Sequence, residues 1–277
     1  MSARSYRHLL PDAWGHALMK GIASWWHLVH FLGIVLVVVL SPSTYHRVNR
    51  AATSQYIYTS TWQVLPWFTA LTALLSLVLI RIVVVSAQSY GLSQYALEMV
   101  VRVLVLELIP LAAAMFVALR SGMVFNAGAL GTLPPPETRS PRPQRRLRLH
   151  WVVSLSMQRL RSELVPRVLA EAFSVLAMAT VSSVIALVLA YLTVYGLSPW
   201  GLQFYTYSVA RVFDLTVTLG FALKTLLFSL AVAVVPMAAS LEAAQQTATY
   251  STVQPGAVRL FLVLLLIEAA SLAVKYI

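Results

Sequence analysis

The chain has 277 residues, of which 59% are hydrophobic and only 10% are charged, and its net charge is +11. This composition excludes a soluble globular domain and predicts one integral membrane domain, whose positive excess points to cytoplasmic loops and anionic lipid rather than to nucleic acid. The chain contains no cysteine, which excludes disulfides, thiolate metal sites and cysteine nucleophiles.

Six apolar stretches are long enough to be considered as membrane spans. The first, at 22–40, follows a basic N-terminus that lacks the pattern of a cleaved signal. The other five are equally or more apolar, and they lie at 62–86, 94–120, 168–195, 209–235 and 256–276. The number of crossings is therefore either five or six.

The distribution of positive charge favours five crossings. The segment 121–163 contains seven arginines against two glutamates, and both the N-terminus and the 41–61 loop are also net positive. Arginine and lysine collect in cytoplasmic loops, so all three segments lie inside only if 22–40 does not cross. The Trp25–Trp26 pair in that stretch suits a helix in the membrane interface. The sequence therefore predicts an interfacial elbow, five transmembrane helices and a cytoplasmic N-terminus.

The connecting segments fit this topology. Residues 87–93 carry no charge and 196–208 are rich in aromatic residues, so we expect both outside. Residues 236–255 fall in the cytoplasm although they contain no basic residue. The segment 133–163 begins as a proline-rich extended spacer and continues at 146–163 as an amphipathic helix suited to lie on the membrane or dock a partner.

Motifs of known enzyme classes are missing from the sequence. It contains no Gly-rich phosphate loop ending in Lys-Ser/Thr, no His-Glu-x-x-His and no Gly-x-Ser-x-Gly. We therefore expect no catalysis, no metal site and no cofactor in this chain.

Ionisable residues inside apolar helices are the candidates for function, because hydrocarbon tolerates them only where they face protein or a polar cavity. Glu98 and Arg102 are four residues apart, as are Arg167 and Glu171, so each pair can neutralise itself on one helix face. Arg211 and Asp214, three apart, have the same option. Such pairs near the ends of spans serve structure as readily as function.

Glu107 and Lys224 lie deeper. Glu107 is nine residues past Glu98 in its predicted span, beside Pro110, where we expect the helix to break. It has no basic residue three or four positions away and needs a partner from another helix, a cavity water or a proton. Lys224, in the middle of its span, either pairs with Glu107 or Glu268 of another helix or lines a lumen.

Five short motifs, in order, resemble the MlaE-type permease family, the membrane subunits of bacterial ABC lipid transporters that work with MCE proteins. They are Glu107-Leu-Ile-Pro110, Arg120-Ser-Gly122, Leu130-Gly131-Thr132, Val165-Pro166-Arg167, and Asp214 placed ten residues before Lys224-Thr225. The resemblance covers roughly residues 14–277 and implies an all-α integral membrane protein with an elbow helix and five spans.

The resemblance further implies a permease that moves phospholipid or a similar hydrophobic lipid between the bacterial inner membrane and a periplasmic MCE protein. A separate ATPase subunit would bind ATP and Mg, and a second permease chain would complete a dimer. The single permease domain, 1–277, would divide into an elbow region (1–61), two spans (62–132), a coupling loop (133–163) and three spans (164–277). The candidates on the lipid path or for intramembrane polar roles are Glu98, Arg102, Glu107, Pro110, Arg120, Asp214 and Lys224, and those for ATPase coupling are Arg145, Arg146, Arg148, Trp151, Arg159 and Arg161.

The chain also departs from the family pattern. Leu106 stands where an arginine usually precedes the motif glutamate, and Ala129 replaces the glutamate before Leu-Gly. The acidic coupling segment is replaced by the longer Pro/Arg-rich stretch. These changes fit a divergent subunit that pairs with a different permease chain. Two other functions stay open: a non-transporting permease fold that scaffolds an MCE and ATPase complex, and a small membrane enzyme acting on lipids.

Overall fold

The computed structural model describes residues 54–129, 165–245 and 256–276, together with the helical positions 30, 32, 33 and 37. The chain separates into two units, Met1–Tyr45 and His46–Ile277, and the five predicted spans all lie in the second unit. Apart from the four positions given, the predicted elbow at 22–40 lies outside the described residues. The predicted coupling loop at 133–163 lies outside them entirely.

The described part of the second unit is built from helices. Two of them, η2 and η3, are π-helical, with a wider turn than an α-helix. In chain order the elements are η2 (Tyr58–Trp62), α3 (Leu65–Ser89), α4 (Ser93–Val100), η3 (Val101–Leu108), α5 (Ile109–Ala129), α7 (Val165–Tyr195), α8 (Gly201–Val212), α9 (Leu215–Gln245) and α10 (Ala257–Tyr276).

Five of the described helical stretches are long and apolar enough to cross a membrane. They are Leu65–Ser89, Tyr95–Ser121, Pro166–Tyr195, Leu215–Ala239 and Ala257–Lys275. The prediction of an all-α membrane protein with five spans is therefore confirmed for the part of the chain that the structure describes.

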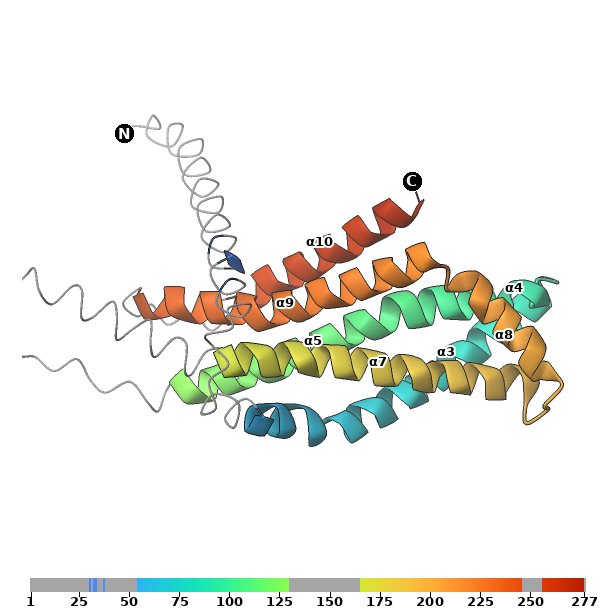
Figure 1. Cartoon of the computed structure of the whole chain (residues 1–277), viewed down its shortest axis with the longest axis horizontal. Coiled ribbons are helices and arrows are strands. Elements are labelled where there is room, and N and C mark those ends of the chain that lie inside the picture. The colour runs from blue at the N-terminus through green and yellow to red at the C-terminus, as the bar shows by residue number, and fades with distance from the viewer. Residues whose placement is uncertain are drawn as a thin grey trace, which may run out of the picture. The chain divides into compact units, whose positions relative to one another are not determined.

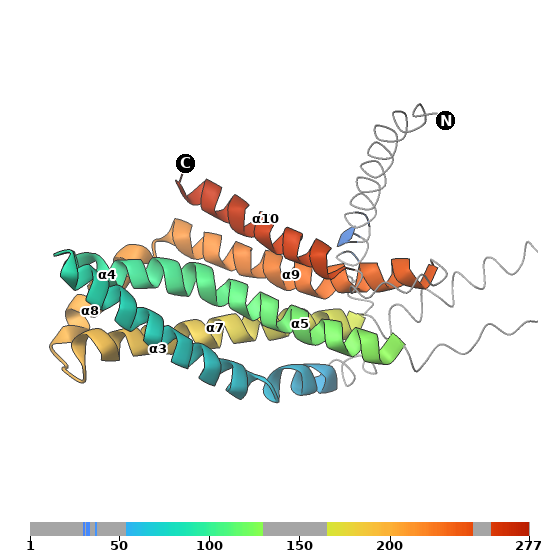
Figure 2. The same ribbon diagram turned by 180° about the vertical axis from the view of Figure 1, so that it is seen from behind.

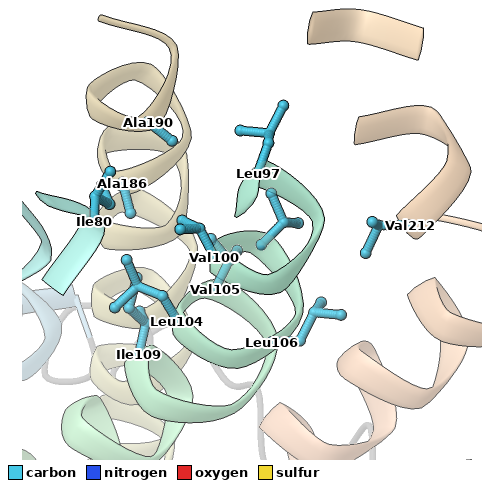
Figure 3. Close-up of a cluster of buried hydrophobic side chains, with 11 residues drawn as sticks. Ile80, Leu97, Val100, Leu104, Val105, Leu106, Ile109, Ala186, Ala190 and Val212 are labelled. Atoms are coloured by element: carbon cyan, nitrogen blue, oxygen red, sulfur yellow. The ribbon is translucent and has the colours of Figure 1, made fainter. Parts of the chain in front are cut away.

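The α7 helix is the centre of the bundle. It packs against α3, α5 and α9, while α10 lies against α9 and, to a smaller extent, α5 (Figure 1 and Figure 2). Lipid supplies no hydrophobic force between helices, so close packing and short polar side chains hold such bundles together. Ala186 and Ala190 of α7 are fully buried and let α3 and η3 approach (Figure 3). Nearby, the Thr72 hydroxyl of α3 donates to the Ser182 hydroxyl of α7 at 3.2 Å.

The predicted break at Pro110 is wrong, because the helix continues from η3 into α5. The proline instead follows a π-helical segment, in which the Ile109 N–H donates to the carbonyl of Leu104, five residues earlier. Proline has no N–H to donate to Leu106, so the α-helical bonding pattern cannot be completed at this point. The wider turn carries the helix past the proline without a break.

The predicted span at 209–235 is misplaced at its start. The chain leaves the helix at Phe213 and Asp214, and the span begins at Leu215. The Asp214 carboxylate accepts a hydrogen bond from the Leu215 N–H at 2.7 Å. The backbone carbonyl of Asp214 accepts one from the Thr218 N–H at 2.9 Å, which is the first hydrogen bond of the new helix. The segment predicted as an outside loop, 196–208, is helical from Gly201 onward.

Candidate functional site

The site is built around Glu107, which the π-helical turn of η3 carries at its C-terminal end. Leu104, Val105 and Leu106 before it are buried against neighbouring helices, so the segment is fixed in place. Glu107 itself keeps only 15% of its side chain exposed. Single π-helical turns occur often at functional sites because they shift which side chains a helix presents.

Lys224 of α9 supplies the positive charge opposite Glu107. Its side chain is 3% exposed, and its ammonium forms an ion pair with the Glu107 carboxylate. The ammonium also lies 3.5 Å from the carbonyl of Leu106, the group that Pro110 leaves without its α-helical donor. The aromatic ring of Phe228, one turn further along α9, lies 5.7 Å from the same nitrogen. The Lys224 ammonium therefore lies beside the carbonyl whose α-helical donor is missing because of Pro110, and it also faces the Phe228 ring.

The last helix adds two more charges. Glu268 of α10 places its Oε2 2.8 Å from the Lys224 ammonium and forms a second ion pair with it. Lys275, two turns further along α10, donates to Glu107 Oε1 at 3.0 Å. Glu107, Lys224, Glu268 and Lys275 form the four-charge cluster, in which two carboxylates balance two ammonium groups across η3, α9 and α10.

The depth of the cluster makes this balance necessary. Glu107 lies twelve residues after Tyr95, the first residue of its span, or about 18 Å along the helix. This is near the middle of a hydrocarbon core about 30 Å thick. An unpaired charge at that depth costs at least roughly 2.5–3.5 kcal/mol. The ion pairs with Lys224 and Lys275 therefore offset the cost of placing the Glu107 carboxylate there.

An apolar groove lies on the α3 side of η3. It has a volume of about 340 Å³ and is lined by residues of α3, the turn after it, α4 and η3. Its walls are almost wholly aliphatic, with Tyr90 and Tyr95 at the end nearest the turn. The four cluster residues do not line it, although Leu104 and Leu108 of η3 do. The η3 segment thus lines the apolar groove and, through Glu107, also contributes to the four-charge cluster.

The sequence model of the family described as Permease MlaE matches residues 53–133 and 152–274, which is most of the chain. The chain belongs to the MlaE permease family. It is therefore a multi-pass membrane protein and the permease of an ABC-type transporter. Comparisons with curated proteins and with solved structures found no match.

Other charged residues predicted for this MlaE permease lie away from the cluster. Arg102 and Glu98 pair within their helix, with Nη2 and Oε1 2.8 Å apart, and Arg167 and Glu171 pair at 3.5 Å. The predicted pairing of Arg211 with Asp214 is wrong, because the helix ends between them.

Arg211 instead donates to the Tyr207 hydroxyl at 3.2 Å, and this contact raises the pKa of the arginine. Asp214 immediately precedes α9 and therefore lies at the end of a span, remote from its middle. The six predicted ATPase-coupling residues, Arg145 to Arg161, lie outside the described residues.

The aromatic residues around α8 hold that helix against α7. The Tyr205 hydroxyl donates to the Leu187 carbonyl at 2.8 Å, and burial raises the pKa of Tyr205 to about 12. Its ring meets those of Tyr191 and Tyr195 edge-on. Gly201 is required at the start of α8, because a Cβ there would lie 2.7 Å from the Tyr195 ring.

Sequence reasoning anticipated the partners of Lys224 but missed Lys275. A lysine at the end of a span normally extends its ammonium towards water, so the sequence offered no reason to place Lys275 in an ion pair inside the membrane. The signal that could have revealed it was its spacing of seven residues from Glu268, which places both on one face of a helix.

Proposed function

We propose that this permease moves phospholipid or a similar hydrophobic lipid between the inner membrane and a periplasmic MCE protein. A separate ATPase subunit drives the movement and binds ATP and Mg. The observation that carries the proposal is the apolar groove between α3 and η3, because η3 also carries Glu107 of the four-charge cluster.

The shape and chemistry of the groove suit an alkyl chain. Its aliphatic walls offer apolar contact without a hydrogen-bonding pattern, which is what a hydrocarbon chain requires. Tyrosine is enriched at the level of lipid headgroups, so Tyr90 and Tyr95 mark the end of the groove nearest the membrane surface. A lipid held with its headgroup at this end would place its chain along η3.

The exposure of the four-charge cluster supports a paired permease. Lys224 is nearly fully buried, but Glu107, Glu268 and Lys275 keep 15–17% of their side chains exposed. In a single chain this exposed part would face hydrocarbon at high cost. A second permease chain, or a polar cavity enclosed by it, removes that cost. We therefore place the cluster at or beside the contact between two permease chains.

The experiment is lipid transfer by the reconstituted complex, with the groove filled by a large side chain. Ile82→Trp places an indole among the groove-lining residues, whereas Val85→Trp, on the same helix and equally exposed, lies outside the groove. We expect Ile82→Trp to slow transfer at least several-fold and Val85→Trp to leave it unchanged, both normalised to assembled complex. Equal rates for the two variants would refute the groove as the lipid path.

The same experiment separates transport from scaffolding. A non-transporting permease fold would assemble with its MCE and ATPase partners, yet no groove or cluster variant would alter the rate of lipid transfer. Loss of transfer in Ile82→Trp with assembly intact excludes that alternative.

A further inference from the structure

Arg81 of α3 is an exposed cation inside a membrane span, and neither the groove nor the four-charge cluster involves it. It lies 16 residues after Leu65 and eight before Ser89, the two ends of its span, so the nearer end is about 12 Å away along the helix. The 25 residues of this span make it about 37 Å long, only slightly longer than a hydrocarbon core of about 30 Å. Arg81 therefore lies within the core.

The side of α3 that carries Arg81 is otherwise apolar and uncovered. Leu71, Leu74 and Val78 are exposed and precede Arg81 at intervals of three and four residues, which places all four on one side of the helix. This is the spacing along which one helix packs against another. We call these four residues the arginine face of α3. The groove is lined from the neighbouring side of the helix, by residues such as Ile82.

A guanidinium at this depth requires a partner. Charged side chains inside membrane spans are costly and pair with one another or with other polar groups. Within the part of the chain that the structure describes, the Arg81 guanidinium makes no hydrogen bond and no ion pair. Side chains of a helix lean towards its N-terminal end, whereas the membrane surface nearer to Arg81 lies at the C-terminal end of α3. This direction favours a partner at the depth of Arg81 over a headgroup at the nearer surface.

The chain itself offers no free carboxylate for this purpose. The acidic residues in the described spans are Glu98, Glu107, Glu171 and Glu268, and each forms an ion pair within the same chain. The apolar stretch 22–40 contains no acidic residue. A second copy of the chain would therefore bring another arginine to this face, and its described spans would bring no unpaired carboxylate.

We propose that the arginine face binds a transmembrane helix of a different protein, one that carries a carboxylate at the depth of Arg81. Leu71, Leu74 and Val78 supply the close apolar packing that holds helices together in lipid. The guanidinium supplies a charge-assisted hydrogen bond to the carboxylate, and each charge removes the cost of the other. This proposal does not depend on which molecule the permease moves.

The first test uses the full chain in phosphatidylcholine vesicles, with a leucine-rich transmembrane peptide of about 20 residues as the probe. Three peptides differ only at the middle residue, which is glutamate, lysine or leucine. The chain has no cysteine, so Ser89→Cys at the end of α3 takes a single fluorophore for energy transfer from the labelled peptide. Arg81→Met removes the charge. Arg102→Met is the matched control, because Arg102 pairs with Glu98 of its own helix.

We expect the wild-type chain to bind the glutamate peptide roughly ten-fold more tightly than the leucine peptide. Arg81→Met should bind these two peptides equally, and Arg102→Met should keep the wild-type preference. Arg81→Glu should prefer the lysine peptide, a reversal that a folding defect could not produce. The proposal is overturned if wild type binds the glutamate and leucine peptides equally, or if Arg81→Met keeps the preference.

A second arm uses native membranes and separates a protein partner from a lipid headgroup. A photoreactive amino acid at Val78, one turn before Arg81, should crosslink to a membrane helix that contains an aspartate or glutamate. The crosslink should be lost in Arg81→Met and kept in Arg102→Met. Capture of a helix without an acidic residue contradicts the proposal. So does the absence of a captured helix together with binding of phosphatidylglycerol, measured by native mass spectrometry, that falls in Arg81→Met, because Arg81 then binds a headgroup.

Discussion

Replacing Lys224 by methionine tests whether charge balance holds the four-charge cluster together. The substitution keeps an unbranched side chain one atom shorter and removes the ammonium that contacts Glu107, Glu268 and the Leu106 carbonyl. Glu107 then keeps its ion pair with Lys275, whereas Glu268 loses the ammonium it contacts. We expect Lys224→Met to lower the free energy of unfolding substantially, because an uncompensated carboxylate stays at mid-membrane depth.

The magnitude is set by burial. Removing one partner of a buried ion pair costs roughly 3–5 kcal/mol. The carboxylates keep 15% and 17% of their side chains exposed, so we expect the lower end, about 3 kcal/mol. Arg102→Met is the control, since it breaks an ion pair whose arginine is 40% exposed and should cost no more than about 1 kcal/mol.

A double-mutant cycle makes the reasoning testable. Glu268→Gln in the Lys224→Met background restores neutrality, with Glu107 and Lys275 still paired at 3.0 Å. The double variant should therefore be more stable than the sum of the single changes predicts, by about 1–3 kcal/mol. Reversible unfolding in mixed micelles supplies the four free energies. Strict additivity, or a Lys224→Met variant no less stable than Arg102→Met, would refute charge balance as the stabilising principle.

Three further predictions address transport, topology and pH. Glu107→Gln should leave the complex assembled yet slow lipid transfer, and Glu107→Leu should slow it more; normal transfer by both would remove Glu107 from the mechanism. Topology reporters fused after Arg50 and after Arg146 should both report cytoplasm and one near Ser198 should report periplasm, and opposite locations for the first two would contradict the five-span topology. Because burial raises the pKa of Tyr205 from 10.0 to about 12, the stability it provides is complete below pH 10 and lost as pH rises through about 12. An ultraviolet titration should show a late tyrosinate step that disappears in Tyr205→Phe; an unchanged titration would contradict the burial argument.

The spans could be predicted because the bilayer imposes them. An apolar run of about 20 residues has few stable structures other than a membrane-spanning helix, so length and composition suffice to find it. The boundary at Asp214 could not be found this way, since apolar residues continue on both sides of it. What sets the boundary is a local group of hydrogen bonds that starts α9, from Leu215 and Thr218 back to Asp214.

The partners of Lys224 were predictable by elimination, whereas the geometry of the site was not. A lysine in mid-span needs a carboxylate, and few carboxylates lie at that depth, so Glu107 and Glu268 were the candidates. The π-helical turn at η3 has no sequence signature beyond the proline that comes after it. The spacing of seven residues places Lys275 on the same face of α10 as Glu268, but it does not say which helix that face meets.

The four-charge cluster joins α10 to η3 in a way that apolar packing could not. Helices surrounded by lipid gain no hydrophobic free energy from apolar contacts with one another, so such contacts rely on close packing alone. The contacts of Glu107 with Lys275 and Lys224 are different, because separating them exposes charges to hydrocarbon. Moving α10 away from η3 is therefore costlier than breaking an apolar contact, unless a polar group replaces the lost ion pairs. In a permease, this restriction would link the opening of the bundle to the arrival of a polar group at mid-membrane depth.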